Sequence, residues 1–533
     1  MKPTINHTII ESKQQVLLSQ TTPVNLKKIL ISVCIALMAV IASVSGLNVA
    51  QPMLALEFDI SQSTVLWIIN IYALTLAALL LPLSAVGDRL GRKKMLLMGL
   101  VIFGAASMLS AIATNVAIML LARLMTGIGA ALIMPITLAV ITSTFPSKER
   151  SKAIGIWTGV AGGGGILGMY LSALLVDVAS WRWLFLLPVV LGVISIIMTI
   201  RFIPDSIEKS EHRFDIVGSL LSVIAIAFLV YGLHEAPGLG WTAPLVLSSL
   251  FIGILAVIGF IIWELGYQGA LLDVRLFGKR NLSGGSITLL TVFGVQAGIF
   301  IVLFPFFQGV LGWSGLRSTI GMMPMAVLMM LSSALAPKLV LKVGSRYTIA
   351  FGIALGAIGA LLMGQLVSVE GGYVSILPGM LVMGLGMGFS MTPSTEAITS
   401  SLPADRQGVA SALNDITREL GTALGVALLG PLVSAQYRVA IGEKLSGFPK
   451  ELITRVKEGL AHAQAVAPST GTKAEIVIRI ARESFVSGWQ QAMWIGVGFM
   501  SALFIYILIK GPEKNKEATH YTTVPSITNE NGF

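Results

Sequence analysis

Long apolar runs separated by short polar segments make up most of this chain. Runs of about 20 residues, each long enough to cross a bilayer as an α-helix, recur along nearly the whole length. The pattern predicts about fourteen membrane spans, which begin near residues 29, 64, 95, 116, 152, 183, 214, 243, 283, 317, 347, 373, 407 and 488. We therefore expect an all-α integral membrane protein with polar tails at residues 1–28 and 511–533.

Composition supports this fold class and excludes several functions. Of 533 residues, 55% are hydrophobic and 12% are charged, whereas a soluble protein carries about a quarter charged residues. The single cysteine, Cys34, excludes a disulfide framework and a thiolate metal cluster. The five histidines do not fall at mid-span, and the sequence lacks HExxH and phosphate-binding glycine motifs. We expect no metal site and no cofactor, and the sequence argues against an enzyme.

Basic residues are concentrated in alternate loops. Clusters occur in DRLGRKK (88–94), PSKERSK (146–152) and RLFGKR (275–280), whereas the intervening loops carry few cations. By the positive-inside rule these loops lie in the cytoplasm, and an even number of spans then places both termini there. Membrane topology thus accounts for the net charge of +10, and nucleic acid is not an expected partner.

Two pairs of motifs occur in the same order in each half of the chain. DRLGRKKMLLMG (88–99) has a counterpart in LKVGSRYTIAFG (341–352), and FPSKERSKAIG (145–155) has one in LPADRQGVASA (402–412). Parallel six-span repeats build many transporter halves. The repeat predicts an N-terminal six-helix bundle at 29–205, an inserted transmembrane helix pair at 214–264 and a C-terminal six-helix bundle at 281–510.

One long hydrophilic segment, residues 435–487, lies between the last two spans and outside the cytoplasm by parity. Apolar residues recur at helical spacing in KELITRVKEGLAHAQAVA (450–467) and KAEIVIRIARESF (473–485). We expect an amphipathic helical hairpin at the extracytoplasmic mouth.

The thirteenth span carries the main candidates for proton coupling. Asp415 and Glu419 lie one turn apart on one face of the predicted helix, with Arg418 beside them. Charged groups inside a span are energetically expensive and usually mark a proton, ion or substrate pathway. We expect Asp415 to pair with Arg418 and Glu419 to carry the proton; a purely structural salt bridge is the alternative. Glu396, near the cytoplasmic end of its span, is a further candidate that is more typical of a gate charge.

Several motifs follow one another in the order found in a known transporter family. WIINIYALTLAALLLPLSAVGDRLGRKKML (67–96), ARLMTGIGAA (122–131) and DRQGVASALNDITRELGTALGVALLG (405–430) resemble the major facilitator superfamily, and within it the fourteen-span drug:proton antiporters. The resemblance implies two six-helix bundles plus two inserted helices in a bacterial cytoplasmic (inner) membrane. It also implies a monomer that exports lipophilic, often cationic, compounds by proton antiport with alternating access, driven by the proton gradient.

The same resemblance assigns a conformational latch to the loop between spans two and three. Asp88, Arg89 and Arg92 flank a turn that needs Gly91 for its geometry. Asp88 stands at a span end, where a carboxylate can pair with cations or with the N-terminus of another helix. A role in topology alone is the alternative, which we disfavour because an acid adds nothing to the positive-inside signal. Ser84 stands where the family usually has the first glycine of the motif.

Small residues predict close helix packing on spans four and five. Glycines at four-residue spacing let a neighbouring helix approach, and the candidates are Gly127, Gly155, Gly159, Gly163 and Gly168. The family's Gly-Pro turn on span five is Gly168-Met169 here, so the kink that the proline would impose is not expected.

Span one departs from the family at a functional position. Family members commonly carry an aspartate where this chain has Ser43, so Arg123 on span four loses its expected acidic partner. Since an unpaired buried guanidinium is costly, we expect Arg123 to pair with water, with Ser43, Ser45 or Asn48, or with an anionic group of the substrate. The last possibility supports an alternative function, export of an endogenous anionic or zwitterionic metabolite, a siderophore or a lipid-like molecule.

Candidate cargo contacts are polar or aromatic residues inside the spans. Aromatic faces attract desolvated cations, although most aromatic residues in spans serve packing or interface anchoring. The candidates are Trp67, Tyr72, Trp157, Phe304 and Phe306, with Gln308 as a polar cavity residue.

Overall fold

Fourteen helices of the structure are long and apolar enough to cross a membrane. The computed structural model describes residues 25–60, 62–205, 214–267 and 269–512, and the fourteen helices are counted within these ranges. The prediction of about fourteen spans is confirmed, and the protein is a multi-pass membrane protein. An all-helical fold suits a bilayer because each helix satisfies its own backbone hydrogen bonds in hydrocarbon.

The first six of these helices pack against one another. They are α2 (Leu26–Phe58), α3 (Gln62–Leu90), α4 (Arg92–Ala111), α5 (Val116–Thr144), α6 (Ser147–Val178) and α7 (Trp183–Phe202). Helix α5 contacts α2, α3 and α4, while α2 also contacts α6 and α7. We call this group the first half.

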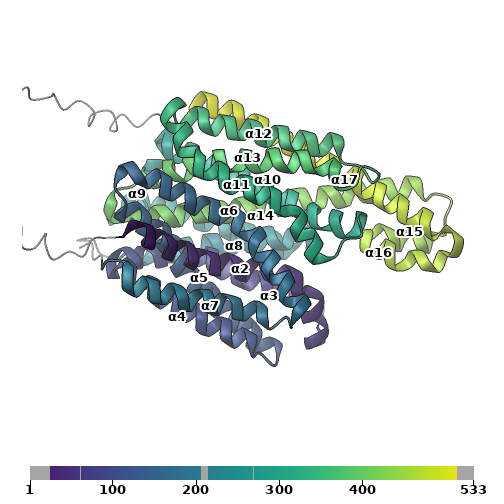
Figure 1. Ribbon diagram of the computed structural model, residues 1–533, viewed down its shortest axis with the longest axis horizontal. Coiled ribbons are helices and arrows are strands. Elements are labelled where there is room, and N and C mark those ends of the chain that lie inside the picture. Colours follow the sequence, from purple (N-terminus) through teal and green to yellow (C-terminus); the bar gives the residue numbers. More distant parts are fainter. Residues whose placement is uncertain (1–24, 61, 206–213, 268, 513–533) are drawn as a thin grey trace, which may run out of the picture.

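The last six membrane-crossing helices form the second half. They are α10 (Arg280–Pro305), α11 (Gly315–Val343), α12 (Ser345–Leu366), α13 (Gly372–Thr399), α14 (Gln407–Lys444) and α17 (Ala474–Lys510). Helix α13 contacts α10, α11 and α12, and α17 contacts α10, α12 and α14. The two halves lie side by side, with α6 packed against α11 between them (Figure 1).

Glycines allow α6 to approach α11 closely. A Cβ atom added at Gly155 would lie 2.6 Å from the Ser333 carbonyl oxygen, and one added at Gly163 would lie 2.7 Å from Met330 Cγ. Larger side chains would force the two helices apart, which explains the small-residue spacing. The other candidate glycines also face neighbouring helices: Gly159 faces α11, Gly168 faces α2 and Gly127 faces α3.

Two helices lie between the halves in sequence, α8 (Ile216–Leu239) and α9 (Pro244–Gly266). Helix α8 contacts both α3 of the first half and α14 of the second. Asp215 caps α8 by accepting a hydrogen bond from Gly218 N (2.8 Å) and another from Trp263 Nε1 of α9 (3.0 Å). Glu264, which is 3% exposed, accepts a hydrogen bond from Leu272 N (3.2 Å) in the following linker. These polar contacts hold α8, α9 and the following linker together at one end of the helix pair.

The hydrophilic segment near the C-terminus, residues 435–487, is largely helical. Helix α14 continues to Lys444 and α17 begins at Ala474, so both helices extend into the predicted 435–487 loop. Between them lie α15 (Lys450–Lys457), α16 (Leu460–Val466) and the 3-10 helix η4 (Ala467–Lys473). The first predicted amphipathic stretch (450–467) is divided into α15 and α16 at Gly459, whose φ is 151°, and the second (473–485) forms the first part of α17. Both predicted stretches are thus helical, and α14 and α17 continue beyond their apolar parts because hydropathy marks the bilayer edge and not the helix end.

Helix α10 ends in a π-helical turn, η2 (Phe306–Val310), after Pro305. The Leu311 N–H donates to the Phe306 carbonyl five residues back (3.0 Å). The extra residue changes which side chains point inward: Phe306 is fully buried, and Gln308 is exposed.

The two ends of the molecule are formed by different elements. The end at which α3 ends and α14 begins carries Asp88, Arg92, Arg150 and Arg406, and we call it the basic face. Helices α15 and α16 lie at the opposite end (Figure 1).

Candidate functional site

Asp88 joins the two halves at the basic face. Its carboxylate accepts hydrogen bonds from the backbone N–H groups of Gly408 (2.8 Å) and Val409 (3.3 Å) in the first turn of α14. Arg92 Nη2 lies 3.0 Å from the same carboxylate, and Asp88 is only 7% exposed. A helix N-terminus carries partial positive charge and free N–H groups, so it stabilises this buried acid. Gly91 supplies the tight turn with a φ of 99°.

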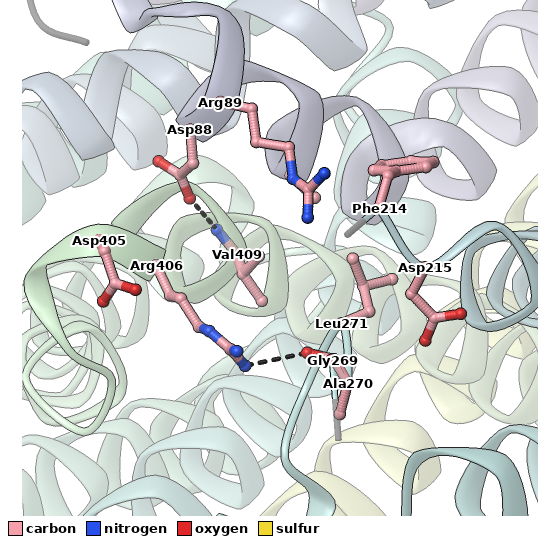
Figure 2. A pocket seen from close by; sticks show the side chains of 11 residues that line it. Asp88, Arg89, Phe214, Asp215, Gly269, Ala270, Leu271, Asp405, Arg406 and Val409 are labelled. Atoms are coloured by element: carbon pink, nitrogen blue, oxygen red, sulfur yellow. Dashed lines mark hydrogen bonds between the residues drawn. The ribbon is translucent and has the colours of Figure 1, made fainter. Parts of the chain in front are cut away.

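The segments on either side of the inserted pair meet at the same place. The Arg89 guanidinium lies 5.5 Å from the centre of the Phe214 ring, just before α8. Arg406 Nη1 donates a 2.9 Å hydrogen bond to the Ala270 carbonyl, just after α9. These residues and Asp88 line one small cavity, as Figure 2 shows. One flank of the pair is therefore attached to the first half and the other flank to the second half.

A further contact between the halves involves Glu396. Its carboxylate, on α13, accepts a hydrogen bond from Ser151 Oγ on α6. Both residues lie toward the basic-face ends of their helices. This contact matches the expected gate charge more closely than a central proton carrier.

The charged residues of α14 lie inside the protein, as expected. Arg418 Nη1 is 3.4 Å from Asp415 Oδ1, so the predicted ion pair is confirmed. The Asn414 side-chain amide donates to the same oxygen (3.1 Å), and Asp415 is fully buried. The Arg418 guanidinium also lies 4.6 Å from the centre of the Phe293 ring and 5.9 Å from that of Trp157. Phe293 belongs to α10 and Trp157 to α6, so the cluster includes both halves.

Glu419 is placed differently from Asp415. It is half-buried, and no residue in the described part of the chain forms a hydrogen bond with its carboxylate. The carboxylate interacts electrostatically with Arg418 and Asp415 on its own helix and with the Tyr72 hydroxyl on α3. Glu419 thus lies between the α14 cluster and the polar residues of the first half.

Arg123 has neutral partners. Its Nη1 donates to Ser43 Oγ (3.1 Å) and its Nε to the Ile68 carbonyl (3.4 Å), while the guanidinium stacks 4.3 Å from the centre of the Tyr72 ring. The Ser43 contact is among the predicted possibilities. Arg123 is completely buried, and its Nη2 has no hydrogen-bond partner in the described ranges. The Asn48 side chain lies outside the described part of the chain.

The remaining aromatic candidates serve mainly packing. Trp67 pairs with Tyr231 of α8 at 5.6 Å between ring centres. Phe306 packs against Trp489 at 5.4 Å, and Phe304 is partly buried beside the core. The π-helical turn directs Phe306 into the second half, and its contact with cargo stays a prediction. The same turn leaves Gln308 exposed.

Sequence reasoning missed three participants of these sites. Phe293 lies in a uniformly apolar run, so its contact with Arg418 follows only from tertiary packing. Trp157 was a candidate, but Thr137, which accepts its indole N–H at 3.1 Å, was not. Gly408 did carry a signal, because a small residue directly after the DRQ motif suits a helix N-terminus that receives a carboxylate. A Cβ atom added there would lie 2.7 Å from Asp88 Oδ2.

Sequence comparisons agree with the fold. The family model described as Major Facilitator Superfamily matches residues 33–426. The chain is 27% identical to the multidrug resistance protein Stp of Mycobacterium tuberculosis, over 86% of this chain and 87% of that protein. It is 29% identical to the methyl viologen resistance protein SmvA of Salmonella typhimurium (83% and 89%) and 30% identical to the multidrug efflux pump LfrA of Mycolicibacterium smegmatis (82% and 87%).

Solved structures share the architecture at low sequence identity. The proton:xylose symporter XylE superposes with a TM-score of 0.58 at 15% identity, over 93% of this chain and 98% of that one. The human organic anion transporter MFSD10 gives a TM-score of 0.56 at 13% identity (90% and 100%). These similarities concern the fold alone.

Proposed function

Because the chain belongs to the Major Facilitator Superfamily, whose members are transporters and not enzymes, we propose that it exports lipophilic, often cationic compounds in exchange for protons. Its relatives include proteins that confer resistance to multiple drugs and to methyl viologen, which fits a cargo of this class. We further propose a monomer in a bacterial inner membrane, driven by the proton gradient without a bound cofactor. Both termini would then be cytoplasmic.

The observation that carries this proposal is the environment of the Glu419 carboxylate. It is a carboxylate within a membrane-crossing helix, without a hydrogen-bond partner among the described residues and electrostatically linked to both halves. A group in this position can hold a proton when it is neutral and release it when a cation or a guanidinium approaches. Asp415 is less suited to carry the proton, because it already has Arg418 and Asn414 as partners.

The arrangement of the halves suits alternating access by rocking. At the basic face, Asp88 with α14 and Glu396 with α6 hold the halves together. Breaking these contacts would open the basic face, while the interior cluster on α14 lies between the halves. We assign the latch to Asp88 and its N–H donors, with Arg92 as the neighbouring cation.

Export of an anionic metabolite is less well supported. It required Arg123 to be available to the cargo, whereas Arg123 has Ser43, the Ile68 carbonyl and the Tyr72 ring as partners. The complete burial of Arg123 also leaves little room for a cargo carboxylate.

Substitution Glu419→Gln tests the proposal. In proteoliposomes with an imposed pH gradient, uphill efflux of a lipophilic cation should fall to background, because glutamine cannot exchange a proton. Downhill movement of the cation should persist. The matched control is Glu443→Gln, the same change at an exposed position of the same helix, which should leave efflux unchanged. Full uphill efflux in the Glu419 variant would contradict the proposal.

A further inference from the structure

Arg418 occupies a position with the features of a cation-binding site. Two aromatic rings and a carboxylate surround its guanidinium: Phe293 at 4.6 Å, Trp157 at 5.9 Å and Asp415 at 3.4 Å. Aromatic faces and a buried carboxylate are the groups that attract a desolvated organic cation. Trp157 is fixed by its hydrogen bond to Thr137, so its position does not depend on Arg418.

The guanidinium is held loosely in this position. A strong arginine–carboxylate pair forms two parallel hydrogen bonds at about 2.8 Å, whereas only Nη1 approaches Asp415 here, at 3.4 Å. Arg418 Nε and Asp415 Oδ2 are both buried without a hydrogen-bond partner among the described residues. An optimised structural salt bridge would have used these atoms. The Arg418 guanidinium therefore occupies the site without satisfying all of the hydrogen-bonding atoms around it.

We infer that Arg418 is a stand-in cation, which holds the site beside Asp415, Phe293 and Trp157 until a cationic cargo displaces it. The inference rests on the proposed function and names the residue that determines how tightly a cation binds. While Arg418 remains in place it competes with cargo for the carboxylate and the two rings. Arg418 is therefore a specificity-determining residue that excludes weakly binding cations.

Displacement also connects cargo binding to the proton. A displaced guanidinium needs another acceptor, and Glu419 is the neighbouring carboxylate without a hydrogen-bond partner in the described ranges. When Arg418 pairs with Glu419, the Glu419 carboxyl releases its proton to water. The movement of the Arg418 side chain thus couples cargo binding at Asp415 to proton release at Glu419.

Tetraphenylphosphonium binding to the full-length protein in detergent tests this inference, with affinity and released protons measured by calorimetry in buffers of different ionisation enthalpy. Wild type should bind and release protons. Arg418→Gln should bind roughly tenfold more tightly, because one like charge is removed from the site, and should release few or no protons. Arg455→Gln, at an exposed position of α15, is the matched control and should behave as wild type.

Two results would overturn the inference alone: unchanged or weaker binding by a folded Arg418→Gln protein, or proton release equal to that of wild type. Arg418→Lys provides a second test if the glutamine variant does not fold. Lysine keeps the charge but lacks the flat guanidinium, so it should bind the probe a few-fold more tightly while still releasing protons; unchanged affinity would contradict the inference. Absence of cation binding by wild type would instead overturn the proposed function, and this inference with it.

Discussion

Two buried arginines, one in each half, show how the same side chain is used in two ways. Arg123 is completely buried and bonds to a hydroxyl, a carbonyl and a tyrosine ring, all of them neutral. Arg418 is 9% exposed and lies beside a carboxylate and a phenylalanine ring. Removal of Arg123 leaves neutral groups behind, whereas removal of Arg418 leaves the Asp415 charge alone. Arg123 is thus held by neutral groups alone, and Arg418 forms an ion pair with an acid.

The largest effect is expected for Arg418→Gln. Without its partner, the fully buried Asp415 carboxylate is uncompensated, and breaking such a pair costs about 3–5 kcal/mol in buried sites. Reversible unfolding in mixed micelles should show a loss of unfolding free energy near the lower end of this range, because the observed pair has a single long contact. Adding Asp415→Asn to the variant should restore most of the stability. Failure of the double variant to recover would mean that Arg418 acts mainly through its packing on Phe293.

Ser43→Ala should have an intermediate effect. The change removes the acceptor for Arg123 Nη1 and leaves a second buried donor of that guanidinium unsatisfied, next to Nη2. An unsatisfied buried donor costs about 1–3 kcal/mol. The same unfolding titration measures it, and Ser43→Thr, which keeps the hydroxyl, is the matched control. Equal stability of the alanine and threonine variants would show that water already replaces the serine.

Tyr72→Phe should have the smallest effect. The ring that stacks on Arg123 is retained, and the lost hydroxyl has no hydrogen-bond partner in the described part of the chain. We expect a change below about 1 kcal/mol, since the cation–π contact is preserved. Tyr72→Leu, which removes the ring, should cost more. If the two variants unfold at the same denaturant concentration, the stacking contributes nothing to the burial of Arg123.

The sequence predicted the features that depend on local pattern. Apolar run length located the spans, because the bilayer imposes one thickness on every helix. The i, i+3 spacing of Asp415 and Arg418 predicted their contact, since such residues share one helix face. The position of Asp88 at a span end predicted cations or a helix N-terminus as its partners, but not that the helix is α14.

The features that depend on packing between helices were not predictable. Phe293 reaches Arg418 from another helix, and no periodicity in α10 marks it. The π-helical turn shifts the side-chain register after Pro305, so helical periodicity did not show that Phe306 is buried while Gln308 is exposed. The hydropathy pattern did not show that α14 continues to Lys444 or that the amphipathic stretch at 473–485 is continuous with the last span, because both helices extend beyond their apolar parts.

The attachments of α8 and α9 have a mechanical consequence. The segment before α8 is held through Phe214 to Arg89, and the segment after α9 is held through Ala270 to Arg406. The closed end formed by Asp215, Trp263 and Glu264 keeps the two segments near each other. If the halves separate at the basic face, as we propose, these attachments oppose that separation. The two extra helices thus add contacts to both halves at the face where the proposed opening would occur.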